Sequence, residues 1–232
     1  MAPWPYWRCR ARLLQSPFII PCHRSGATTM SLRLKFMALA AALGLSACSS
    51  TPTHYYTLIA PMASNPQPIA SPAPFQFEML PVLMAVQVDQ PPLVVRQGNG
   101  SLAILDAERW GSPLGDEFHD ALTGQLERRF GSRDMAGLPK DAAQPVLSLR
   151  TDVRRFESAL NQYALIDVVW TLGLRNNDAK RQSLTCSSII REPAGQGMEN
   201  LVIAHQRAVS RLADSIAKTA ITWSQQTSTR CP

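Results

Sequence analysis

The chain has 232 residues, of which 23 are Lys or Arg and 17 are Asp or Glu, for a formal net charge of +6. Six basic residues and no acidic residue lie in the first 47 positions, so the rest of the chain carries 17 of each sign and is formally neutral. Nucleic-acid binding requires a basic patch on a folded domain, and we therefore expect no nucleic-acid partner.

Residues 1–29 do not have the composition of a domain. They contain four prolines, four arginines and no acidic residue. We interpret them as an extension upstream of the true start at Met30, with a dual-targeting extension as the alternative, and exclude them from the fold.

Residues 30–47 have the pattern of a lipoprotein signal peptide. Two basic residues precede an apolar stretch over 36–45, which is too short to span a bilayer. The sequence Leu-Ser-Ala-Cys that ends at Cys48 resembles a lipobox, so we expect palmitate or similar acyl chains on Cys48 and no other cofactor. Ser49 follows in place of Asp, which predicts transfer to the outer membrane.

The chain after the signal peptide is long enough for a single domain, over residues 54–232, preceded by a tether over 48–53. Cys186 and Cys231 are the cysteines left in this domain. Two thiols in an oxidising periplasm can pair, and the sequence leaves open whether these two do.

The first half of the domain predicts strands. Residues 54–60 have the composition of a strand, whereas residues 61–74 contain five prolines and predict a surface loop. Residues 75–88 predict a strand bent near Pro81. Residues 93–105 predict a hairpin that turns at Gly98 and Gly100.

A helix is predicted from Ser112 to Gly131. Ser112 is expected to cap it, Pro113 to be its first residue, and the acidic residues of its first turns to be solvated. Apolar residues at every fourth position form the stripe expected to face the core: Leu114, Phe118, Leu122, Leu126 and Phe130.

The second half predicts an antiparallel meander over 146–190, in which apolar and polar residues alternate, and a final helix over 199–224. Strands, helix, strands and helix in this order predict an α+β fold. We expect a mainly antiparallel or mixed sheet packed by two amphipathic helices.

Catalytic patterns are missing from the sequence. Ser112 does not lie in a G-x-S-x-G motif, and we expect no metal site. The histidines His54, His119 and His205 are expected to be exposed or partly buried. The pair Arg154-Arg155 is expected to lie on a solvated face.

Several segments together resemble the PqiC family of ABC-type transport auxiliary lipoproteins. They are the lipobox, the HYYTL sequence with Tyr55 and Tyr56, and the helix entry with Trp110, Pro113 and Leu114. The resemblance implies a non-enzymatic outer-membrane lipoprotein that faces the periplasm and helps to maintain envelope integrity. It implies as partners an MCE-domain membrane protein and the inner-membrane components of an ABC-type phospholipid transporter, and by analogy a homo-oligomer.

Two other functions remain open from the sequence. The chain has the size of other envelope lipoproteins, such as pilotins and factors that assemble lipopolysaccharide or lipoproteins. A periplasmic lipid hydrolase is the third hypothesis, although no sequence motif supports it.

Overall fold

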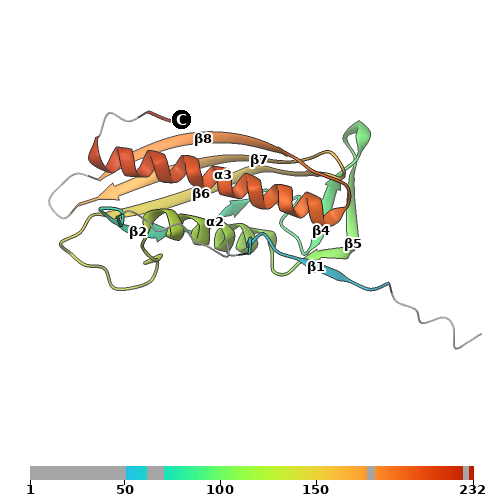
Figure 1. Cartoon of the computed structure of the whole chain (residues 1–232), viewed down its shortest axis with the longest axis horizontal. Helices are drawn as coiled ribbons and strands as arrows, with labels where there is room; N and C mark the ends of the chain where they lie inside the picture. Colours follow the sequence, from blue (N-terminus) through green and yellow to red (C-terminus); the bar gives the residue numbers. More distant parts are fainter. Residues whose placement is uncertain (1–50, 62–70, 177–180, 227–229) are drawn as a thin grey trace, which may run out of the picture. The chain divides into compact units, whose positions relative to one another are not determined.

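The computed structural model describes residues 51–61, 71–176, 181–226 and 230–232. These residues form two sheets and two α-helices (Figure 1). This arrangement confirms the predicted α+β class. The segment interpreted as a signal peptide, together with Cys48, Ser49 and residues 62–70 of the proline-rich segment, lies outside the described residues.

The smaller sheet contains the hairpin predicted from the glycines. Strands β4 (Pro92–Arg96) and β5 (Leu102–Trp110) pair antiparallel around a single 3-10 turn, Gly98–Gly100. Gly100 has a φ of 79°, which a residue with a Cβ adopts only with strain. Strand β1 (His54–Tyr56) pairs parallel with the other side of β5, so the strand order of this sheet is β1-β5-β4.

The larger sheet is built around the predicted meander. Strands β6 (Val146–Ala159), β7 (Tyr163–Arg175) and β8 (Gln182–Pro193) pair antiparallel in sequence order. Two short strands, β2 (Gln76–Met79) and β3 (Leu83–Met84), pair parallel with β6. The break between them contains Pro81, as predicted, because proline lacks the N–H that a ladder requires.

Two helices pack on each other and on the larger sheet. Helix α2 (Leu114–Phe130) and helix α3 (Met198–Gln225) bury the stripes expected from their sequences. Gly131 ends α2 in the left-handed region, at a φ of 67°, as predicted. Arg129 connects the helices through Asp214 at 2.6 Å and the carbonyl oxygen of Ser210 at 3.1 Å.

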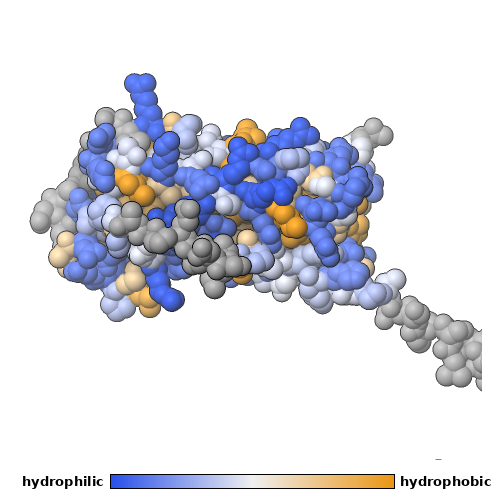
Figure 2. Space-filling model, in the orientation of Figure 1, coloured by the Kyte–Doolittle hydropathy of each residue, from blue (hydrophilic) through white to orange (hydrophobic). Residues whose placement is uncertain are grey.

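The apolar stripes of both helices are buried, as expected for stripes that face the core. The buried residues of α2 and α3 belong to one cluster with the inner side chains of the larger sheet, including Trp170 and Phe77. Figure 2, in the orientation of Figure 1, shows that this view is largely hydrophilic and that its apolar spots are small and separate. The helix stripes are therefore core.

The start of α2 differs from the sequence prediction. The helix begins at Leu114, and Pro113 is its N-cap residue with an extended ψ of 139°. Ser112 caps nothing, because its hydroxyl donates to Glu117 at 3.1 Å. Instead, Asp89 accepts a 3.0 Å hydrogen bond from the amide of Gly115. A side chain distant in sequence thus replaces the predicted local cap.

Within the described residues, neither helix has the combination of length and apolar composition that crossing a membrane requires.

Candidate functional site: an arginine-lined groove and its junctions

Glu117 attaches the N-terminal segment of the domain to α2. Its carboxylate accepts hydrogen bonds from the hydroxyl of Thr57 at 2.7 Å, the amide of Leu58 at 2.9 Å and the hydroxyl of Ser112. Its exposure is only 6%. The expectation of a solvated first turn is therefore wrong for Glu117, which attaches the residues just after β1 to the start of α2.

The five residues of the family motif lie around this junction. Tyr55 is 68% exposed, whereas Trp110 and Leu114 are buried and Pro113 occupies the cap of α2. Tyr56 is half-buried, and burial together with the nearby Glu108 carboxylate raises its pKa to about 12. Tyr56 also lies opposite Trp110 in the β1–β5 register, so the motif holds the first strand in place.

Trp110 belongs to an aromatic cluster that contains a completely buried histidine. The ring of His205 stacks on Phe156 with the centroids 4.0 Å apart, and Trp110 meets both rings edge-on. His205 was expected to be exposed or partly buried, but its exposure is 0%. The error arises because imidazole on the inner stripe of α3 packs here as an aromatic ring. Burial lowers the pKa of His205 to about 3.

His205 and Ser158 form a pair that resembles part of a catalytic triad. The hydroxyl oxygen of Ser158 lies 2.8 Å from Nε2 of His205. A serine hydrolase would also need a carboxylate at Nδ1 of the histidine and access for the substrate. Nδ1 of His205 is buried without a partner among the described residues, and Ser158 is itself buried. The geometry therefore favours a structural pair.

A groove of about 300 Å³ lies between the β4–β5 hairpin and β6. Its walls combine basic and apolar side chains, and we call it the arginine groove: Ala85, Gln87, Val88, Val94, Arg96, Leu102, Arg154, Arg155, Phe156, Glu157 and Ser158. Three guanidinium groups and one carboxylate therefore line it.

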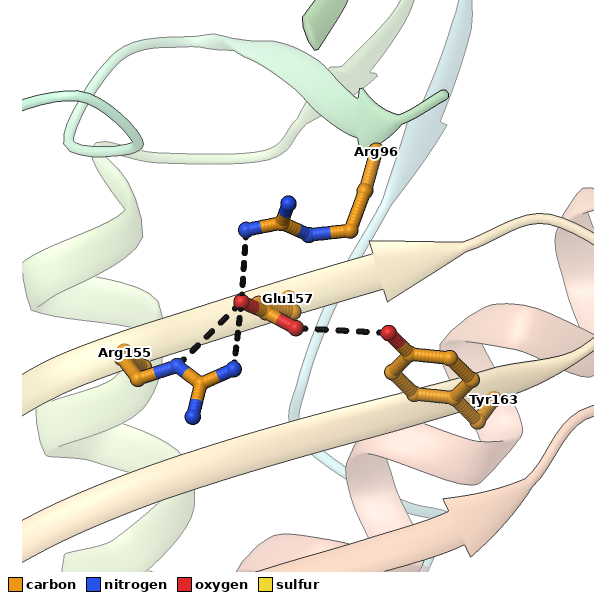
Figure 3. Close-up of polar contacts among 4 residues, drawn as sticks. All are labelled: Arg96, Arg155, Glu157 and Tyr163. Carbon is orange, nitrogen blue, oxygen red and sulfur yellow. Dashed lines mark hydrogen bonds and ion pairs between the residues drawn. The ribbon is translucent and has the colours of Figure 1, made fainter. Parts of the chain in front are cut away.

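Glu157 is the centre of the polar contacts in the arginine groove (Figure 3). Its Oε1 atom accepts hydrogen bonds from Arg96 on β4 and Arg155 on β6, each at 2.7 Å. Its Oε2 atom accepts a longer hydrogen bond, at 3.4 Å, from the hydroxyl of Tyr163 on β7. Glu157 thereby connects the smaller sheet to the larger one.

The charges of this cluster stabilise one another. Burial raises the pKa of Glu157, but the hydrogen bonds and positive charges of Arg155 and Arg96 outweigh that effect and hold the pKa below its usual value. Glu157 in turn raises the pKa of Arg155. The carboxylate therefore stays ionised at neutral pH. Among the described residues Arg154 has no ion-pair or hydrogen-bond partner.

A β-bulge creates the arginine groove. The register between β6 and β7 shifts between Val153 and Arg155, so that Arg154 and Arg155 both face outward. The sequence interpretation of this pair as solvated was correct for Arg154 but missed the ion pair of Arg155. Two consecutive polar residues within a strict alternation were the available signal. No local pattern indicated Arg96 and Glu157, because they meet across 61 residues.

Cys186 and Cys231 form a disulfide, with Cα atoms 5.5 Å apart. Cys186 lies in the core on β8, whereas Cys231 lies at the C-terminal end of the chain. The bond attaches the tail to the larger sheet.

The other two histidines in the described part of the chain form no cluster that suggests catalysis. His54 lies 3.1 Å from Glu108, and His119 lies 3.0 Å from Asp120. Over the described ranges, no group of three or more His, Cys, Asp or Glu side chains is placed to hold a metal ion.

Comparisons with known proteins agree with this architecture. An uncharacterized protein of known structure is 15% identical, with a TM-score of 0.56 over 72% of this chain and 98% of that chain. A DUF330 protein from Xanthomonas campestris is 20% identical, with a TM-score of 0.51 over 77% and 99%. At these identities the likeness shows the fold alone.

A search of the curated proteins finds no match. The model of one family, however, matches residues 56–217, which begin at the last residue of β1 and include the Glu117 junction, the arginine groove and most of α3. The chain therefore belongs to the family of ABC-type transport auxiliary lipoprotein components.

Proposed function

We propose that this protein is a non-enzymatic outer-membrane lipoprotein, anchored through acyl chains on Cys48, that serves as the accessory subunit of an MCE-type phospholipid transporter. Its partners are an MCE-domain membrane protein and the inner-membrane components of an ABC-type transporter. This proposal adds the membrane, the cargo and the partner to what the family description gives.

The short connection between Cys48 and the fold carries the proposal. Five residues lie between Cys48 and His54 at the start of β1, and a fully extended chain would cover these six steps in about 20 Å. Glu117 then fixes Thr57 and Leu58 to α2. A lipid on Cys48 would hold the domain against the bilayer, and more than one acyl chain makes release negligible.

The chemistry of the described residues supports a docking role over an enzymatic one. Ser158 lies in the lining of the arginine groove beside His205, but among the described residues this buried pair has no carboxylate at Nδ1 of His205 to complete a triad. A rigid domain that presents a basic groove close to a membrane has the properties that an accessory subunit requires.

Membrane fractionation and co-purification test this proposal. The wild-type protein is expected in the outer-membrane fraction, and Cys48→Ala is expected in the soluble periplasm. Cys231→Ser is the matched control, since it removes a cysteine without removing the anchor. Crosslinking in cells, followed by purification, is expected to recover an MCE-domain protein with the wild type. Recovery of a secretion or lipopolysaccharide-assembly component in its place would contradict the transporter role.

The hydrolase hypothesis has its own test. Purified protein is expected to release neither fatty acid nor headgroup from phospholipid vesicles. Release that disappears in Ser158→Ala would show that the protein is an enzyme.

A further inference from the structure

The arginine groove has an excess of positive charge that its own carboxylates do not neutralise. Arg96, Arg154 and Arg155 line it against Glu157. Other charges surround these lining residues. Arg191 places its guanidinium 3.9 Å from the ring of Tyr163, Asp167 lies opposite Arg155 on β7, and Asp106 is exposed on the same face of β5 as Leu102. The three guanidinium groups and one carboxylate of the lining leave two positive charges in excess, although the chain after residue 47 is formally neutral.

Exposed apolar side chains border the same groove. Val86 is 87% exposed and lies between Ala85 and Gln87, which both line the groove. Leu102 is 48% exposed and is itself part of the lining. Ile104 is 53% exposed and lies on the same face of β5 as Leu102, because successive side chains of a strand alternate.

Arginines bordered by exposed aliphatic side chains match the surface of a bilayer that contains anionic lipids. Guanidinium groups bind phosphate, and apolar side chains enter the boundary between headgroups and acyl chains. The surface also belongs to the same sheet as the first strand after the expected anchor, because β1 pairs with β5, the strand that carries Leu102 and Ile104. In the β1–β5 register His54 lies opposite Glu108, and Glu108 is six positions after Leu102 on β5. Cys48 is likewise six positions before His54 in the sequence.

We propose that the arginine groove and its rim, Val86, Leu102 and Ile104, form a docking surface for the headgroups of an anionic phospholipid bilayer. The orientation of this surface toward the membrane rests on the proposed lipidation of Cys48. Docking orients the domain on the membrane, whereas the acyl anchor alone holds it without fixing its rotation.

Vesicle binding by protein without lipid tests the surface separately from the anchor. The buried core lies between Leu58 and Trp223, so a chain that starts at Ser49 keeps every core residue. This chain is expected to sediment with vesicles of phosphatidylethanolamine and phosphatidylglycerol, but not with vesicles of phosphatidylcholine. Binding is expected to weaken as salt rises, because salt screens exposed charges.

Substitutions in the groove should change this binding in both directions. Arg154→Gln is expected to weaken it about fivefold, the contribution of one basic residue near an anionic surface. The double variant Leu102→Ser, Ile104→Ser is expected to weaken it further. Glu157→Gln is expected to strengthen it about fivefold, because it removes a negative charge and releases Arg96 and Arg155.

The controls are exposed residues elsewhere. Arg150→Gln, on β6, and Ile189→Ser, on β8, remove a charge and an apolar side chain outside the arginine groove and should leave binding unchanged. Circular dichroism and unfolding midpoints exclude folding defects. Equal binding by all variants, or no preference for anionic vesicles, would overturn the proposal.

Two other outcomes would show that the surface binds something else, or that the docking surface fails while the proposed function holds. Loss of a homo-oligomer in Leu102→Ser, Ile104→Ser, measured by sedimentation, without loss of vesicle binding would assign the rim to a second copy of the chain and overturn bilayer docking. Absence of vesicle binding while Cys48 still directs the protein to the outer membrane would overturn the docking surface alone.

Discussion

The carboxylate of Glu117 accepts a 2.7 Å hydrogen bond from the hydroxyl of Thr57, which lies 60 residues earlier in the chain. The contact joins the first residues of the fold to the start of α2. The same buried carboxylate also accepts hydrogen bonds from the amide of Leu58 and the hydroxyl of Ser112.

Replacing Glu117 should therefore loosen the N-terminal strand. Glu117→Ala leaves three donors without their acceptor, and we expect it to lower the free energy of unfolding by about 3 kcal/mol. Amide exchange in residues 54–60 should accelerate more than exchange in β7. Chemical unfolding and hydrogen exchange with mass spectrometry measure both effects.

Asp116→Ala is the matched control for this variant. Asp116 lies one residue earlier on the same helix but is exposed, so its removal should cost less than about 0.5 kcal/mol. Equal losses from both variants would show that Glu117 contributes only through the helix dipole.

The cap of α2 gives a second prediction. Because Asp89 accepts from the amide of Gly115, Asp89→Ala should cost about 1 kcal/mol and accelerate exchange of that amide. Ser112→Ala should leave exchange at Gly115 unchanged, because the hydroxyl of Ser112 bonds to Glu117. Exchange followed by NMR distinguishes the two. Acceleration in Ser112→Ala alone would restore Ser112 as the cap.

These contacts show which parts of the molecule can be predicted from sequence. The strict alternation of β6 and the four-residue spacing in α2 correctly predicted which side chains are buried, because both follow from local geometry. Pairing between distant segments has no local signature. Glu117 therefore appeared in the sequence as a solvated acid, and no sequence pattern indicated Asp89 as the cap.

The arginine groove shows the same limit. The bulge was visible in the sequence as the pair Arg154-Arg155 within an alternating strand. The ion pair of Arg155 with Glu157 was not, because Glu157 is partly buried between the two sheets. His205 was predicted incorrectly because polarity alone suggested exposure, whereas its position on the inner stripe of α3 indicated burial.

The burial of His205 predicts a specific pH dependence. Its pKa is about 3 in the folded protein and about 6.5 in the unfolded chain, so between these values the unfolded state binds more protons. The stability is fully present above pH 6.5 and falls as the pH decreases. From pH 6.5 to pH 5 the free energy of unfolding should fall by about 2 kcal/mol.

Urea unfolding at a series of pH values measures this slope. His205→Gln should remove it, because glutamine does not titrate. Ser158→Ala should retain it, since burial and not the contact with Ser158 lowers the pKa of His205. The interpretation is wrong if His205→Gln keeps the slope of the wild type.

The disulfide provides the last prediction. It closes a loop of 45 residues between Cys186 and Cys231, and the chain-entropy model gives about 4 kcal/mol for a loop of that length. Cys231→Ser should lose somewhat less, because the released tail also gains freedom in the folded state. Cys186→Ala should lose more, because Cys186 is buried and its replacement leaves a space in the core.

Reductant separates the bond from the side chains. It should lower the urea midpoint of the wild type to that of Cys231→Ser and leave Cys231→Ser unchanged. Since Cys231→Ser touches only the end of the chain, it should still fold and should still bind anionic vesicles through the arginine groove. A reductant-insensitive wild type, or two free thiols in the native protein, would show that the cysteines do not pair in solution.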